Sequence, residues 1–172
     1  MLRNEFFFIA LIFVLLGCGE DETPLFEMKF DTVLEIESGL NTIETFYFPI
    51  NNIPTSFNSY ANNLSADDIG SIRPASCRIE GGFSNINYNF IREIYINAID
   101  PAFPNVSREI FYLEENFAND NNELELFGSL LNVKDVFIND RVNLEVRVRF
   151  RIPTPGVSEH RITFSLFAFA EE

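Results

Sequence analysis

The segment that decides the fold is Arg141-Val142-Asn143-Leu144-Glu145-Val146-Arg147-Val148-Arg149-Phe150-Arg151-Ile152. Apolar side chains occupy every even position, and polar ones occupy every odd position. In a β-strand successive side chains point to opposite faces, so this order puts one face on a core and the other in water. A helix would spread the same charges around its circumference. The pattern therefore predicts a long strand over residues 141–152 with one solvated face.

The same alternation recurs along the chain and predicts further strands. It is clear in residues 26–36 and shorter at 43–50, 72–80, 91–99, 108–113, 123–127 and 161–170. Short helices are expected at 56–63, continuing towards 69, and at 133–138 after an Asn132 cap. These elements predict an all-β fold, a two-sheet antiparallel sandwich, broadly immunoglobulin-like, with one or two short connecting helices. The short link 153–156 predicts that its two flanking strands are antiparallel neighbours.

Composition limits the classes of function. The chain has 172 residues, 20 Phe, no Trp and a net charge of −14. Such a chain is long enough for one domain with its own core, and its acidic surface repels nucleic acid. Nucleic-acid binding is therefore not expected.

The N-terminal residues point to export and a lipid anchor. Arg3 precedes an apolar run that ends in Leu15-Leu16-Gly17-Cys18, followed by the acidic stretch Glu20-Asp21-Glu22. The run is too short to span a bilayer. It resembles the lipobox of bacterial lipoprotein signals. The resemblance implies a signal peptide over residues 1–17 that is removed, a lipidated Cys18 at the start of an acidic tether over 18–25, and a single β-sandwich domain over 26–172. Palmitate is the kind of acyl chain such a cysteine carries.

The acidic stretch indicates where the anchor is placed. It resembles the export signal of Bacteroidota lipoproteins, and the chain as a whole is similar to small Bacteroidota outer-membrane lipoproteins, a resemblance that brings no activity with it. It implies an outer-membrane protein at the cell surface, with the periplasmic face as the alternative. A flexible, solvated spacer is the simpler explanation of the acidic residues. Asp31-Thr32-Val33 resembles a Bacteroidota O-glycosylation site, which makes Thr32 a candidate for that modification.

An arginine row is the feature that stands out most from the rest of the sequence. Arg147, Arg149 and Arg151 share the polar face of the 141–152 strand with Arg141, and Arg161 is expected across the hairpin. Guanidinium groups bind carboxylates and sulfates in a bidentate manner, so Arg147, Arg149, Arg151 and Arg161 are candidate ligands for an anionic glycan. The alternative is pairing with acidic strand faces, for which the partners would be Glu27, Asp31, Glu35 and Glu37.

Other chemistry has weaker support. The single histidine, His160, is expected in an exposed loop, and Cys77 is expected to be a buried thiol. A glycosidase-like pair can be sought among Glu114, Glu115, Asp120 and Glu123, although residues 119–123 are first of all a turn that binds calcium weakly at most. Aromatic residues near the C-terminus are expected in the core: Phe164, Phe167 and Phe169. No catalytic residue, metal or cofactor is assigned.

These observations predict a lipid-anchored cell-envelope protein with a non-catalytic binding or structural role. Its partner would be the membrane through the anchor, together with an envelope protein or an anionic glycan. The alternatives are an enzyme that acts on extracellular polysaccharide, and an anionic-glycan-binding module that uses the Arg147, Arg149 and Arg151 stripe.

Overall fold

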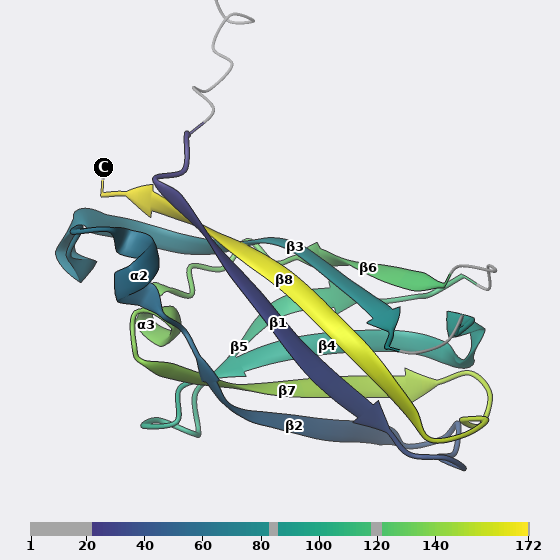
Figure 1. The fold of residues 1–172 in the computed structure, drawn as a ribbon. Coiled ribbons are helices and arrows are strands. Elements are labelled where there is room, and N and C mark those ends of the chain that lie inside the picture. Colours follow the sequence, from purple (N-terminus) through teal and green to yellow (C-terminus); the bar gives the residue numbers. More distant parts are fainter. Residues whose placement is uncertain (1–21, 83–85, 118–121, 172) are drawn as a thin grey trace, which may run out of the picture.

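The computed structural model describes residues 22–82, 86–117 and 122–171, and the lipobox, Cys18 and part of the acidic stretch lie outside them. Strands dominate these residues (Figure 1). They are β1 (Phe26–Ile36), β2 (Thr45–Pro54), β3 (Ile69–Gly81), β4 (Ile91–Ile99), β5 (Ser107–Leu113), β6 (Glu123–Gly128), β7 (Arg141–Phe150) and β8 (Ser158–Ala170). The helical elements are short: α2 (Phe57–Ala61), η1 (Ala66–Asp68), η2 (Tyr88–Phe90) and α3 (Lys134–Phe137).

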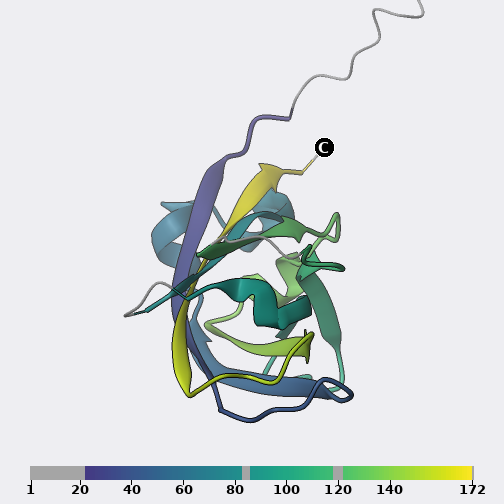
Figure 2. The same cartoon turned by 90° about the vertical axis from the view of Figure 1, so that its right-hand side faces the viewer.

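All strand pairs are antiparallel, in the order β1-β8-β3-β6-β5-β4-β7-β2. The sheet has two halves, β1-β8-β3-β6 and β5-β4-β7-β2. Among the described residues, the register pairs that join them are Phe111 with Gly128 and Tyr112 with Phe127, and the Ser129 amide also donates to the Ile110 carbonyl. Seen end-on, the sheet curves around the core (Figure 2). The expectation of an antiparallel all-β fold with short connecting helices is therefore confirmed, with the two halves linked into one hydrogen-bonded order.

The connections are divided between the two ends of the sheet. The links after β2, β4 and β6, which carry α2, η1 and α3, lie at the end where β1 starts and β8 finishes (Figure 1). The links after β1, β3, β5 and β7 lie at the opposite end. The first described residues and the C-terminal strand end are thus neighbours, and the Leu25 amide donates to the Ala168 carbonyl.

The core follows from the alternation in the sequence. In β7 the even positions from Val142 to Phe150 are all buried, while the odd positions are at least partly exposed. The same parity holds from residue 94 to 99 in β4 and from 159 to 164 in β8, and the buried apolar side chains form one continuous cluster. Its aromatic centre contains Phe164, whose ring stacks on Phe30 at 4.6 Å and meets Phe111 edge-on at 5.8 Å. Burial of these large rings is the main stabilising contribution.

Two expectations about the β7 region are wrong. The strand ends at Phe150 rather than at 152, because the Arg151 amide donates to the Phe90 carbonyl and leaves Ile152 exposed. β7 and β8 are not neighbours: β7 pairs with β2 and β4, and β8 pairs with β1 and β3. The link between them crosses from one half of the sheet to the other. Buried Thr154 fixes this crossing by accepting a hydrogen bond from the Leu40 amide and donating one to the Glu37 carbonyl.

The helices fall where the sequence predicts them, but they are shorter. Asn132 accepts a hydrogen bond from the Lys134 amide at the start of α3, as a capping side chain does. At η1 the side chains and amides of Ser65 and Asp68 form a capping box.

Candidate functional site

A line of aromatic side chains crosses the outer face of five strands. The register pairs Tyr47 with Arg147, Arg147 with Tyr95, Tyr95 with Tyr112, and Tyr112 with Phe127. We call this set the transverse row: Tyr47 on β2, Arg147 on β7, Tyr95 on β4, Tyr112 on β5 and Phe127 on β6. Side chains directly opposite on neighbouring strands have Cβ atoms about 5 Å apart, so the members of the row are neighbours across the sheet. Five strands spaced by about 4.8 Å make the row about 19 Å long.

Local alternation points these residues outwards. Ile94 and Ile96 flank Tyr95 and are fully buried, and Leu126 beside Phe127 is also buried. The pleat must then turn Tyr95 and Phe127 to the other face. The ends of the row are the most open, with Tyr47 58% and Phe127 64% exposed. Contiguous exposed aromatic surface on a folded domain is characteristic of a binding site.

The row is ordered by contacts among its own members. The Arg147 guanidinium lies over the Tyr95 ring, 4.1 Å from its centroid, and the Tyr112 and Phe127 rings are 6.1 Å apart. Burial of the ring and the nearby Glu93 carboxylate raise the pKa of Tyr95, so its hydroxyl stays protonated as a donor. The hydroxyls of Tyr47, Tyr95 and Tyr112 form no hydrogen bond within the described ranges. They are available to a ligand.

The two flanks of the row differ in charge. On one side the register places Arg149 between Thr45 and Glu93. On the other it places Glu145 between Pro49 and Asn97, and Asn97 is opposite Glu109. One flank therefore carries the Arg149 guanidinium beside the Glu93 carboxylate, and the other carries the Glu145 and Glu109 carboxylates.

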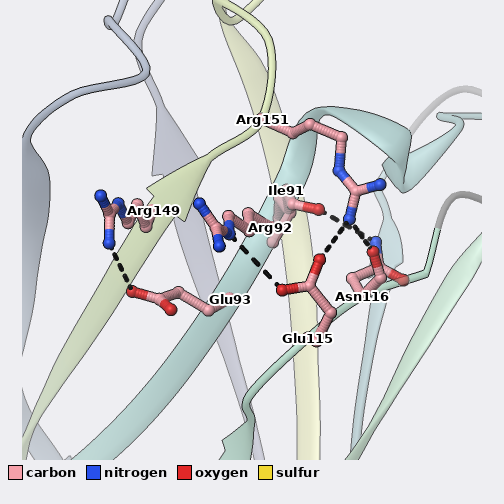
Figure 3. A network of polar contacts seen from close by, with 7 residues as sticks. All are labelled: Ile91, Arg92, Glu93, Glu115, Asn116, Arg149 and Arg151. Atoms are coloured by element: carbon pink, nitrogen blue, oxygen red, sulfur yellow. Dashed lines mark hydrogen bonds and ion pairs between the residues drawn. The ribbon is translucent and has the colours of Figure 1, made fainter.

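The four candidate arginines do not form one stripe. Arg149 contacts Glu93 at 3.9 Å, while Arg151 binds Glu115 at 3.0 Å and also donates to the Asn116 carbonyl (Figure 3). Glu115 is shared with Arg92, at 3.4 Å. Arg161 is on β8, in the other half of the sheet, where its Nε donates to Asp31 at 2.7 Å. The expectation that Arg161 lies across a hairpin from the others is wrong, because β7 and β8 are not paired.

Pairing with acidic residues is found, but mostly not with the partners expected from the sequence. Arg161 with Asp31 is an expected pair. Arg149 and Arg151 use Glu93 and Glu115 instead, because β4 and the segment after β5 are their neighbours. Only the three-dimensional arrangement of the strands determines these partners.

A groove lies on the half of the sheet built from β1, β8, β3 and β6. This groove of about 710 Å³ lies over small side chains, including Ala75, Ser76 and Ser165, between charged residues of the flanking strands. Those charges already pair with one another: Lys29 with Glu27 at 3.0 Å, and Arg78 with Glu123 and Glu125 at 3.3 Å. A ligand would have to compete with these pairs.

The carboxylates considered for glycosidase chemistry lie near the β5–β6 junction. Glu115 and Glu123 line a hollow of about 480 Å³, together with Phe117 and Phe127. Both carboxylates are held by arginines, so the hollow offers paired charges rather than a free acid and a free base. Glu114 does not line it, and Asp120 falls in 118–121, outside the described residues.

The expectation of an exposed His160 is wrong. His160 is fully buried in β8, with Nδ1 2.9 Å from the Tyr88 hydroxyl and Nε2 2.8 Å from the Ser158 hydroxyl. Burial lowers its pKa to about 4, so the ring is neutral. The Ser158 and His160 pair has the contact distance of a nucleophile and its base, but the ring lies inside the core, where no substrate reaches it.

Within the described chain, the remaining candidate residues lie on β1, β3 and β8. Cys77 is buried, as predicted, and burial raises the pKa of its thiol. Thr32 is half-buried on β1 opposite Ile162, and Phe164 is buried, while Phe167 and Phe169 are only partly so. Thr32 glycosylation and Cys18 lipidation stay predictions.

Comparison with known proteins finds no matching family model and no matching curated protein. Within residues 22–82, 86–117 and 122–171, no helix has the length and apolar composition of a membrane span. In the same residues no group of three or more potential metal-binding side chains occurs. The transverse row is the candidate site because of its exposed ends and its tyrosine hydroxyls, unpaired within the described ranges, and the sequence analysis did not identify its aromatic members.

Proposed function

We propose that this protein is a lipid-anchored, non-catalytic binding module of the bacterial cell envelope, and that an extended carbohydrate chain binds across the transverse row. The observation that carries this proposal is the row itself, with exposed rings at its two ends, partly exposed rings between them, and tyrosine hydroxyls that have no partner among the described residues. Sugar rings have apolar C–H faces that pack on aromatic rings, and their hydroxyls accept and donate hydrogen bonds at the rim. An elongated surface that runs across five strands suits a polymer better than a small substrate.

Anchoring is supported by the lipobox resemblance at Cys18 and by the position of β1, which leads directly from the acidic segment. The outer membrane, with the domain at the cell surface, is the proposed location. A Cys18→Ala variant should lose metabolic labelling with a fatty acid. Protease added to intact cells should remove the domain before a periplasmic control protein is cut, and protection would favour the periplasmic face instead.

Binding is tested with soluble protein starting at residue 22 on a panel of polysaccharides, by affinity electrophoresis. Tyr112→Ala/Phe127→Ala should weaken binding by about tenfold or more, since each stacked ring contributes on the order of 1 kcal/mol. Phe103→Ala is the matched control, because Phe103 is 66% exposed but lies on the β4–β5 loop, away from the row. Circular dichroism must show the same fold for all proteins. Unchanged binding by the row variant, or no binding by any protein, would count against the proposal.

A further inference from the structure

Among the described residues, two neighbouring arginines on β7 have no close carboxylate partner. Most arginines have a carboxylate oxygen within 3.4 Å, namely Arg73, Arg78, Arg92, Arg108, Arg151 and Arg161. Among the described residues Arg147 has no such partner, and Arg149 has only Glu93, at 3.9 Å. Arg141 and Lys134 also lack one, but Arg141 donates to the Asn52 carbonyl and Lys134 is an isolated charge on α3.

These two arginines are adjacent on one face and centred on the transverse row. Arg147 is a member of the row, and Arg149 is two residues further along β7, on the same side of the sheet. The Nε atom of Arg149 is buried and has no hydrogen-bond partner in the described part of the chain. The protein has 26 acidic and only 12 basic residues, so acidic partners are abundant. Two neighbouring guanidinium groups without a close ion pair are therefore unexpected.

The Arg147 guanidinium is positioned to bind an external anion, and Arg149 beside it has only the long contact to Glu93. Stacking on Tyr95 fixes Arg147 without using its hydrogen-bond donors on a carboxylate. Arginine matches the planar carboxylate through two parallel N–H···O bonds, and such charge-assisted bonds are stronger than neutral ones. Carboxylates are the charged groups of sugar acids.

We propose that the ligand of the transverse row is an acidic polysaccharide, whose sugar carboxylates bind Arg147 and Arg149 while its rings pack on Tyr47, Tyr112 and Phe127. The inference rests on the proposed function and adds the chemical class of the polymer. It also assigns an orientation. Carboxylates face the Arg149 flank, because Arg149 lies there beside Glu93, whereas the corresponding register positions of the opposite flank hold Glu145 and Glu109 and no arginine.

The experiment compares two probes with the same backbone, polygalacturonate and its fully methyl-esterified form. Wild-type protein should bind the acid at least about tenfold more tightly than the ester, as expected for charge-assisted hydrogen bonds. Its binding of the acid should weaken steeply from about 0.05 M to about 0.5 M NaCl, as screening increases. Arg147→Gln/Arg149→Gln should reduce binding of the acid to the level of the ester and leave the ester unaffected.

Matched variants separate local from global charge effects. Arg73→Gln/Arg108→Gln removes the same charge from two arginines that have carboxylate partners at 2.8 and 3.1 Å, and it should bind the acid almost as wild type does. Glu145→Gln removes the repulsion on the opposite flank and should strengthen binding of the acid but not of the ester.

The outcomes distinguish the two proposals. Equal binding of acid and ester by wild type, abolished by Tyr112→Ala/Phe127→Ala, would overturn the acidic ligand and leave the carbohydrate-binding function standing. Equal loss in the two arginine double variants would also overturn the assignment to Arg147 and Arg149. Binding of neither probe by the folded wild-type protein overturns the acidic-polysaccharide assignment, and the neutral members of the panel then decide the carbohydrate-binding function.

Discussion

The Tyr88 hydroxyl lies 2.9 Å from Nδ1 of His160, inside the core of a protein whose only histidine this is. Both ring nitrogens are satisfied, since Ser158 occupies the other. The contact ties η2, at the start of β4, to β8 in the other half of the sheet. A neutral imidazole between two hydroxyls is therefore part of what holds the two halves together.

Stability should fall with acidification through this histidine. Its pKa is lowered from 6.5 to about 4, so between these pH values the unfolded chain binds a proton that the folded chain does not. The contribution is complete above pH 6.5 and is lost as the pH falls towards 4, up to about 3 kcal/mol. Urea titrations at several pH values should give a shallower dependence for His160→Asn than for wild type. Carboxylates titrate in both proteins, so identical slopes would contradict the role of His160.

Two ion-paired arginines should differ in their contribution to stability. Arg151→Ala should lower the free energy of unfolding by about 1–2 kcal/mol, because its guanidinium also donates to the Asn116 carbonyl beside Glu115. Arg161→Ala should change it little, since Arg161 and Asp31 are both solvent-exposed and screened. Chemical denaturation of both variants measures the difference. A larger loss for Arg161→Ala would refute this ranking.

Two phenylalanines on β8 should differ in the same way. Phe164→Ala should cost about 3–5 kcal/mol, because the ring is 3% exposed and packs on Phe30 and Phe111. Phe169→Ala should cost about 1 kcal/mol, because that ring is on the outer face and loses mainly its contact with the Arg73 guanidinium at 4.8 Å. Thermal unfolding followed by circular dichroism compares them, and similar losses would mean that β8 does not separate an inner from an outer face as described.

A glycine at the start of β3 should resist substitution. A Cβ added at Gly70 would be 2.4 Å from the Ala170 carbonyl oxygen and 2.7 Å from the Glu171 Cα, and these backbone atoms cannot rotate away. Gly70→Ala should therefore destabilise the fold by about 1–3 kcal/mol. Gly156→Ala is the control, because nothing lies within 4 Å of its added Cβ. Equal melting temperatures for the two variants would show that the backbone at Ala170 and Glu171 moves aside without a loss of stability.

The alternation in the sequence was enough to predict the strands and their buried faces. In β8, residues 160, 162 and 164 share the inner face, so the same parity places His160 in the core. Its polar neighbours Glu159 and Arg161 instead suggested a loop, because the strand begins three residues earlier than expected. The parity of β8, extended to residue 160, therefore predicts the inward position of His160.

The transverse row depends on information that a single sequence does not contain. Parity alone turns Tyr47 and Tyr95 outwards on their strands, but in β5 the same parity includes buried Ile110 and does not place Tyr112. Which strands are neighbours, and in which register, is decided by packing of the whole core and by links such as 151–157, which crosses between the halves. For the same reason the partners of Arg149 and Arg151 could not be foreseen from spacing along the chain.

The position of β1 has a mechanical consequence. β1 is paired along its whole length, from Phe26 opposite Ala168 to Ile36 opposite Ser158, and it continues directly from the N-terminal segment. A force along β1, such as the proposed anchor and ligand would produce together, loads the hydrogen bonds of this ladder in shear, all at the same time. A force perpendicular to β1 would instead break these hydrogen bonds one after another. Although β1 is at the edge of the described sheet and pairs there only with β8, this shear geometry resists a pull along the strand better than unzipping would.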